Sequence, residues 1–211
     1  MKTQKPIFIL ISTFVLFTAL TVLVVTENAP VQAFNEALYA PISGFITPFL
    51  TSVASLIGGL THWYTYAPIV LLLLILPTTR RKVGLPLALT LSASAILGPI
   101  ILKNIFAIER PSVNQLIEPG GFGYPSGHSM NALVFFGMCA ILVLRYSKKK
   151  ALRVGFTIFA VVSILLVGLS RIYLGVHTVT DVLGGYLAGA AVLSAALLIE
   201  NRLKQRRGDG A

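Results

Sequence analysis

Three short stretches of this 211-residue sequence carry side chains suited to handling a phosphate group. Together they supply three cations, a hydroxyl, a glycine, two imidazoles and a carboxylate. Phosphoryl transfer needs such a set: donors around the equatorial oxygens, a nucleophile, and an acid for the leaving group. In chain order the candidate residues are Lys103, Arg110, Ser126, Gly127, His128, Arg171, His177 and Asp181.

The spacing of the last two candidates predicts a direct contact. His177 and Asp181 are four residues apart, which places both side chains on one face of a helix. Because helical side chains lean toward the N-terminus, the Asp181 carboxylate can reach back to the imidazole. Lys103 and Arg110 are seven residues apart, so we expect them on one helix face, with Pro111 ending that helix.

Ser126 and Gly127 open an apolar stretch in a way that favours anion binding. Ser126 is a natural N-cap, and the free backbone N–H groups of the first helical turn attract a phosphate. Gly127 lets a ligand approach the backbone closely. The three cations would neutralise the charge that metal ions neutralise in metal-dependent phosphatases. Glu109 and Glu118 alone make a poor divalent site, so the sequence predicts metal-independent catalysis without a cofactor.

Composition indicates that membrane helices position these residues. The chain is 55% hydrophobic and 11% charged, which is too apolar for an ordinary soluble domain. Runs of about 20 apolar residues predict transmembrane spans. We expect an all-α, polytopic membrane helix bundle, a single membrane-embedded domain over residues 1–211, with spans at about 6–26, 64–78, 84–107, 127–145, 153–171 and 178–199.

The region between the first two spans has two features of its own. The apolar segment Ile42–Leu60 contains Pro48 and a glycine pair, and it is interpreted as an interfacial or re-entrant helix pair rather than a span. Val31-Gln32-Ala33 resembles a signal-peptidase site, but the preceding apolar run is long for a signal peptide. We therefore expect a retained first span.

The distribution of positive charge orients the spans. All but three of the 17 Lys and Arg residues flank the spans on one face, which the positive-inside rule makes cytoplasmic together with both termini. Lys103, Arg110 and Arg171 are left for the outer face, where topology does not explain them. Single cations at helix ends are often snorkelling anchors, but three on the disfavoured face point to a bound anion.

The three stretches resemble the signature motifs of the type 2 phosphatidic acid phosphatase superfamily. The motifs read Lys103-x6-Arg110-Pro111, Pro125-Ser126-Gly127-His128 and Ser170-Arg171-x5-His177-x3-Asp181, and they agree at every signature position and in order. The resemblance covers the region from about residue 60 to residue 199. The compact size is similar to bacterial members that act on phosphatidylglycerophosphate, undecaprenyl pyrophosphate or phosphatidic acid.

The resemblance implies a role for each candidate. His177 would be the nucleophile that forms a phosphohistidine, with Asp181 holding its tautomer. His128 would protonate the leaving group and then activate water. The expected phosphate-binding residues are Lys103, Arg110, Ser126, Gly127 and Arg171. The protein would thus be a lipid phosphate phosphatase of the cell membrane, of the bacterial plasma membrane type, with its site facing outward.

Other functions stay open at this point. A membrane transporter would place charges near mid-span, whereas these cluster at helix ends. A lipid phosphotransferase would use the same residues, and a vanadium-dependent peroxidase the same anion pocket. The expected partners are the lipid phosphate and membrane lipids, without nucleic acid; oligomeric state is not encoded in any visible pattern. His62, beside Trp63, Tyr64 and Tyr66, is interpreted as part of an aromatic belt at the membrane interface, with contact to the lipid headgroup as the alternative for His62.

Overall fold

The computed structural model describes residues 4–59, 61–76, 84–111 and 114–206. Every regular element within these residues is a helix, so the predicted all-α class is confirmed. In chain order the elements are α1 (Gln4–Val25), α2 (Ala29–Ser43), α3 (Pro48–Gly59), α4 (Trp63–Ile75), α6 (Leu85–Ile96), the π-helix η2 (Leu97–Leu102), α7 (Lys103–Phe106), α8 (Gly127–Tyr146), α9 (Lys150–Tyr173) and α10 (Val179–Arg206).

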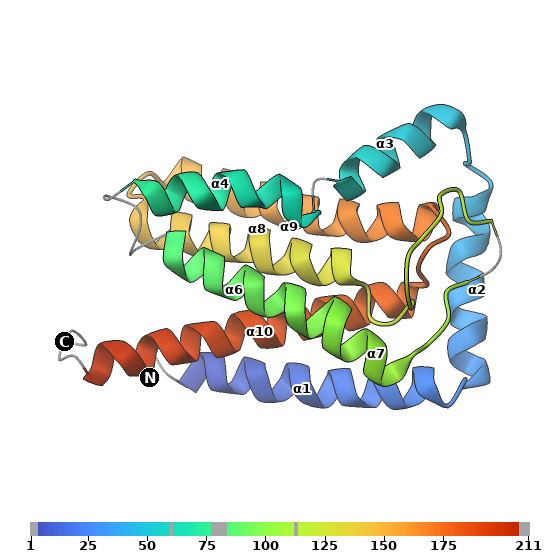
Figure 1. The fold of residues 1–211 in the computed structure, drawn as a ribbon, viewed down its shortest axis with the longest axis horizontal. Coiled ribbons are helices and arrows are strands. Elements are labelled where there is room, and N and C mark those ends of the chain that lie inside the picture. The colour runs from blue at the N-terminus through green and yellow to red at the C-terminus, as the bar shows by residue number, and fades with distance from the viewer. Residues whose placement is uncertain (1–3, 60, 77–83, 112–113, 207–211) are drawn as a thin grey trace.

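Most of the predicted spans coincide with long apolar helices. Five stretches are long and apolar enough to cross a membrane, namely Pro6–Val25, Leu85–Phe106, Gly127–Tyr146, Lys150–Tyr173 and Val179–Arg206. The remaining predicted span, 64–78, coincides with α4, which has 13 residues and is followed by residues outside the described ranges. A sixth crossing therefore stays a prediction. α1 begins and α10 ends at the same end of the bundle (Figure 1).

The segment between the first two spans forms two helices, but only α3 lies within Ile42–Leu60, where the helix pair was expected. α2 begins at Ala29 in the polar stretch, where Pro30 suits the first helical turn. It lies across the end of the bundle, and α3 leads back toward α4 (Figure 1). A helix lying across the ends of apolar spans fits the interfacial alternative.

Helix α8 lies at the centre of the bundle, against α6, α9 and α10. Its contact with α10 is close because small residues line the facing side of α10. A Cβ at Gly185 would lie 2.4 Å from the carbonyl oxygen of Ser126, and one at Gly189 would lie 2.9 Å from that of Met130. Such close helix packing through small residues is typical of membrane bundles. The close packing of α8 on α10 brings the N-terminal ends of the two helices together.

The third span is irregular at Gly98-Pro99. The helix widens there into η2, and Gly98 faces the Met130 sulfur, which a Cβ would meet at 2.8 Å. α7 then ends at Phe106, with Ala107 in the left-handed region (φ 47°). The prediction that Lys103 and Arg110 share one helix face is therefore wrong, because the helix stops four residues before Arg110.

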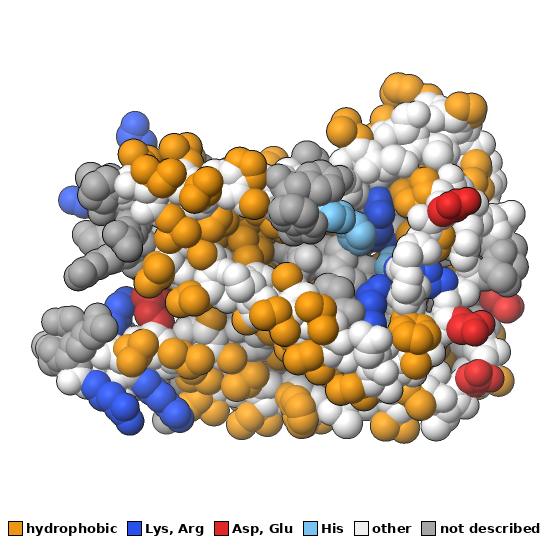
Figure 2. Space-filling view, in the orientation of Figure 1, with side chains coloured by type: hydrophobic (Ala, Val, Ile, Leu, Met, Phe, Trp, Pro, Cys, Tyr) orange, Lys and Arg blue, Asp and Glu red, His pale blue; other side chains and the backbone are white. Residues whose placement is uncertain are grey.

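Charged side chains gather at opposite ends of the bundle. Figure 2 shows basic side chains near the end where α1 begins, and a second group with the histidines in a hollow at the other end. Acidic side chains lie on the surface around this second group (Figure 2). The hollow is where the three predicted motifs meet.

Candidate active site

The His177–Asp181 turn is built by a reciprocal cap at the start of α10. The backbone N–H of Thr178 donates to Asp181 Oδ2 at 2.8 Å, and the N–H of Asp181 donates to Thr178 Oγ1 at 3.1 Å. This Thr-x-x-Asp arrangement is a capping box, which satisfies helix N–H groups that have no partner within the helix. The capping box also holds the Asp181 carboxylate beside His177, the residue before Thr178.

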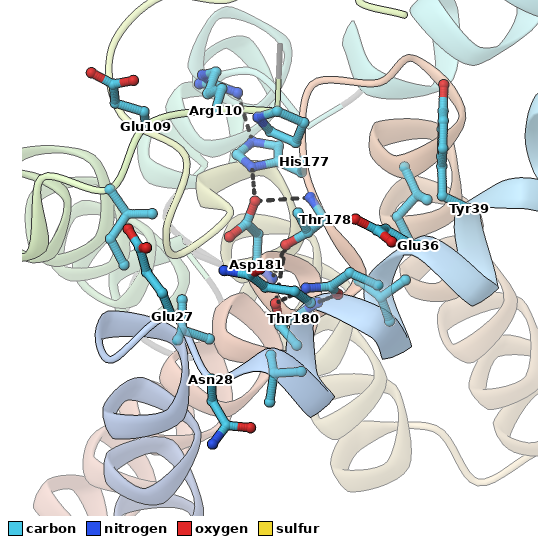
Figure 3. Close-up of a pocket in the computed structure, with 18 of the residues that line it drawn as sticks. Glu27, Asn28, Glu36, Tyr39, Glu109, Arg110, His177, Thr178, Thr180 and Asp181 are labelled. Atoms are coloured by element: carbon cyan, nitrogen blue, oxygen red, sulfur yellow. Dashed lines mark hydrogen bonds and ion pairs between the residues drawn. The ribbon is translucent and has the colours of Figure 1, made fainter. Parts of the chain in front are cut away.

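Both ring nitrogens of His177 have a partner. Nδ1 lies 3.4 Å from Asp181 Oδ2, and Nε2 lies 3.0 Å from Arg110 Nη1. Because a carboxylate accepts and a guanidinium donates, Nδ1 carries the hydrogen and Nε2 presents its lone pair. Figure 3 shows this line of contacts from Arg110 through His177 to Asp181 and Thr178. The arrangement leaves Nε2 as the nitrogen able to attack phosphorus.

The imidazole of His177 stays neutral over a wide pH range. Only 2% of the residue is exposed, and burial lowers its pKa to about 4. Asp181 opposes this shift, while Arg110 and Lys103 add to it. A neutral imidazole has the free lone pair that a nucleophile needs.

The two cations of the first motif hold the loop that precedes Pro125. Lys103 Nζ donates to the carbonyl oxygen of Phe122 at 2.6 Å. Arg110 donates to Gly121 O at 2.9 Å, to Gly120 O at 2.8 Å and, through Nη1, to the backbone oxygen next to His177. Both cations therefore reach the same place although they do not share a helix. A phosphate would compete with these carbonyl oxygens for the cationic donors.

Arg171 is buried under α3. It is 4% exposed, and its Nη2 donates to the carbonyl oxygen of Ala54 at 3.2 Å. Gly58, one turn further along α3, faces the guanidinium so closely that a Cβ there would lie 1.6 Å from Nη2. Arg171 thus depends on a glycine more than 100 residues away, a contact that no local spacing in the sequence reveals.

The start of α8 offers free donors beside these cations. Ser126 is the N-cap, and its Oγ accepts from the N–H of Ser129 at 3.4 Å and from the Ser129 hydroxyl at 3.0 Å, which leaves its own O–H as a donor. Within the described part of the chain, no acceptor pairs with the amides of Gly127 or His128. Ser126 N–H also donates to Asp181 O at 2.9 Å, which ties the two histidine turns together.

The surroundings of two residues assigned to the interfacial belt are now clear. The ring of His62 lies 6.3 Å from that of His128, centroid to centroid, which places His62 next to one of the candidate residues. Tyr66 is buried in the core, where it stacks on Phe135 with centroids 4.8 Å apart and donates to the carbonyl oxygen of Thr61. The side chains of residues 63 and 64 lie outside the described ones.

Tyr124 and Asn35, which the sequence did not single out, each connect a histidine turn to one of the first two helices. Tyr124, fully buried just before Pro125, shares a hydrogen bond of 2.8 Å with the hydroxyl of Thr21 in α1. Burial raises the pKa of this phenol to about 12. Thr180 is held by Asn35 of α2. The first two helices therefore contact both histidine turns, which the interpretation of the first span as a plain anchor did not include.

A cavity of about 800 Å³ adjoins His177 between α2 and the 108–111 segment. Figure 3 shows His177 and Arg110 at the top of the view, with the carboxylates of Glu27 and Glu36 on opposite sides below them. Among the described residues, no group of three or more His, Cys, Asp or Glu side chains is arranged to hold a metal ion.

The model of the PAP2 superfamily matches residues 83–205, which include all eight candidate residues. This chain belongs to the PAP2 superfamily. It is 32% identical over 206 residues to phosphatidylglycerophosphatase B of Bacillus subtilis (strain 168), covering 93% of this chain and 97% of that protein. It is 30% identical over 174 residues to an undecaprenyl-diphosphatase of Sulfolobus acidocaldarius, covering 80% and 79%.

Solved PAP2 structures resemble the fold of this chain as well. The crystal structure of a transmembrane PAP2-type phosphatidylglycerolphosphate phosphatase from Bacillus subtilis superposes with a TM-score of 0.81 at 29% identity, covering 93% of this chain and 98% of that one. Aquifex aeolicus LpxE gives a TM-score of 0.61 at 26% identity, covering 78% and 94%. Together with the long apolar helices, these likenesses identify a multi-pass membrane protein of the PAP2 superfamily.

Proposed function

We propose that this PAP2 protein hydrolyses the phosphomonoester or pyrophosphate of a membrane lipid through a phosphohistidine on His177. The observation that carries the proposal is the environment of its two ring nitrogens, Nδ1 on Asp181 and Nε2 facing the cations. The names of the relatives agree in the class of substrate, since both are phosphatases of lipid phosphates.

In the first half-reaction Nε2 of His177 attacks phosphorus. A P–N bond forms as the bond from phosphorus to the lipid oxygen breaks, and His128 gives that oxygen a proton. Asp181 stabilises the imidazolium that develops. Arg110 Nη1 donates to the lone pair of Nε2. The incoming phosphate must therefore bind this guanidinium and release the lone pair for the attack.

In the second half-reaction water replaces the lipid. His128, now neutral, removes a proton from the water, whose oxygen attacks phosphorus as the P–N bond breaks. Inorganic phosphate leaves and His177 regains its lone pair. Throughout, the cations Lys103 and Arg171 and the amides at the start of α8 balance the charge on the phosphoryl oxygens.

The site would face the outside of the cell membrane. Lys103, Arg110 and Arg171 lie at one end of the bundle. Among the described residues, the basic ones at the end of α8, the start of α9 and the end of α10, which the positive-inside rule makes cytoplasmic, lie at the other. The position of Lys103, Arg110 and Arg171 at the helix ends also disfavours a transport pathway, which needs polar groups near mid-span.

A phosphate-release panel tests the function. The purified protein in detergent with a chelator is given phosphatidylglycerophosphate, undecaprenyl pyrophosphate, phosphatidic acid and a soluble diphosphate. We expect release from at least one lipid without any divalent ion. A soluble diphosphate hydrolysed far faster than every lipid, or strict dependence on a divalent ion, would overturn the proposal.

A further inference from the structure

We propose that Asn35 of α2 is a positioning residue that holds the nucleophilic turn of His177 in its active geometry. The inference rests on the proposed function, because it concerns how His177 is aligned for attack. Asn35 lies outside the stretch 83–205 that matches the PAP2 model, and it lies 145 residues before its partner, Thr180. No motif of the sequence points to it.

The side chain of Asn35 makes two hydrogen bonds to one residue. Its Oδ1 accepts from the backbone N–H of Thr180 at 3.1 Å, and its Nδ2 donates to Thr180 Oγ1 at 3.0 Å. Thr180 is 3% exposed and lies in the first turn of α10, where backbone N–H groups have no partner within the helix. Asn35 thus caps α10 from a different helix.

The contact continues to the nucleophile through side chains that are already hydrogen-bonded. Thr180 Oγ1 lies 3.1 Å from Thr178 Oγ1, and Thr178 is the residue that forms the capping box with Asp181. Asp181 in turn holds Nδ1 of His177. A continuous chain therefore runs from α2 to the imidazole. Loss of its first member would loosen the turn and widen the range of angles at which Nε2 meets phosphorus.

The position of α2 makes this tie important. α2 lies across the end of the bundle, contacts α9 and α10, and contains no fully buried residue (Figure 1). Apolar burial alone therefore fixes this helix weakly. The paired hydrogen bonds of Asn35 give it a defined register against the catalytic turn, on the wall of the cavity beside His177.

The effect should appear in the chemical step and not in phosphate binding. None of the hydrogen bonds of Asn35 reaches Lys103, Arg110 or Arg171, the cations proposed to bind phosphate. A small misplacement of a reacting group lowers the rate without weakening the contacts that bind the substrate.

The test measures kcat and KM of lipid phosphate release in detergent for four variants. Asn35→Leu keeps the approximate shape and removes both hydrogen bonds. Asn35→Asp keeps an acceptor for the Thr180 N–H and hydroxyl. Thr180→Val keeps the bond from its backbone N–H to Asn35 Oδ1 and removes both bonds of the Thr180 hydroxyl, to Asn35 Nδ2 and to Thr178 Oγ1. Gln32→Ala is the matched control, since Gln32 is exposed on the same helix and lines the same cavity.

For Asn35→Leu we expect kcat to fall by about 10- to 100-fold with KM within about twofold of wild type. Asn35→Asp should recover most of kcat, Thr180→Val should lose less than Asn35→Leu, and Gln32→Ala should match wild type. The inference is overturned if Asn35→Leu keeps wild-type kcat, or if kcat of Asn35→Asp is as low as that of Asn35→Leu. If Asn35→Leu does not fold, a wild-type kcat for Thr180→Val overturns it. A wild type that releases no phosphate from any lipid would instead refute the proposed function.

Discussion

Basic side chains lie at both ends of the helix bundle, and the fold treats the two groups in opposite ways. At the end where α10 finishes, Arg145 and Lys204 both pair with Glu200 at 2.6 Å, and their side chains are 30% and 47% exposed. At the other end, Lys103 is only 9% exposed and Arg171 only 4%. Lys103 donates to the neutral oxygen of Phe122, and Arg171 donates to those of Ala54 and Ser170.

From this difference we infer which cations orient the protein and which serve chemistry. An exposed cation near a membrane surface costs little to keep. Burying one without a paired anion is costly, so a fold that buries Lys103 and Arg171 beside neutral acceptors is prepared for an anion that arrives later. The proposed phosphate supplies that charge.

The largest effect should follow removal of the nucleophile. His177→Ala should lower kcat by at least about 10⁴-fold, since the proposed covalent intermediate forms on this imidazole. The measurement is phosphate release from the best lipid of the panel, with the helical circular dichroism spectrum as a control for folding. A folded variant with substantial turnover would remove His177 from the mechanism.

The second prediction compares one arginine from each end. Arg171→Ala should reduce kcat/KM by about 10²- to 10³-fold, as expected when a buried donor to the transition state is lost. Arg171→Lys should recover little, because lysine lacks the planar fork. Arg145→Ala is the control and should keep its activity. Equal losses for the two alanine variants would erase the distinction between the ends.

A third prediction concerns the charge state of His177. Burial holds its pKa near 4, below the ordinary value of about 6.5. Because the folded-state pKa is lowered, the lone pair persists as pH falls and is lost only on passing through about 4. The chain has three histidines, so NMR of histidine-labelled protein in micelles, assigned with His177→Ala, can follow each one. Titration near 6.5 would show that the turn is solvated.

The fourth prediction moves a buried cation without removing it. Gly58→Ala places a methyl group where the Arg171 guanidinium lies, so the guanidinium must shift. We expect KM to rise by about 10-fold. Gly155→Ala in α9 is the matched control, because a Cβ there meets nothing within 4 Å. Unchanged kinetics in Gly58→Ala would mean that phosphate does not need Arg171 in its present place.

The smallest effect should follow loss of the two ion pairs that Glu200 makes with Arg145 and Lys204. Glu200→Gln should destabilise the protein by less than about 1 kcal/mol and leave kcat/KM unchanged, since surface ion pairs contribute little. Thermal unfolding in detergent and the release assay measure the two quantities. A large loss of activity would show that this end of the bundle also serves catalysis.

Local rules predicted the parts of the site that lie within one turn of chain. The reach of Asp181 to His177 and the cap by Ser126 follow from spacing alone, and both contacts are present. The expected helix from Lys103 to Arg110 was wrong, because Ala107 ends α7 with a left-handed residue that composition does not mark.

Contacts between distant helices were not predictable in the same way. Arg171 lies against Ala54 and Gly58, and Asn35 reaches Thr180, across more than 100 residues. Such pairs depend on how α2 and α3 lie over the bundle end, which apolar periodicity does not encode. Tyr66 was assigned to the interface for the same reason, since its burial depends on packing against α8.

The most direct test of the account is to trap phosphate on His177. His128→Ala is mixed with an aryl phosphate lipid that is labelled on its phosphate and whose leaving group needs no protonation. The reaction is then quenched in alkaline detergent, where phosphohistidine survives. The account predicts label on His177, since the first step proceeds and water is no longer activated, and no label in a His177→Ala background. Label on another residue, or none from a preparation that still releases the aryl alcohol, would contradict it.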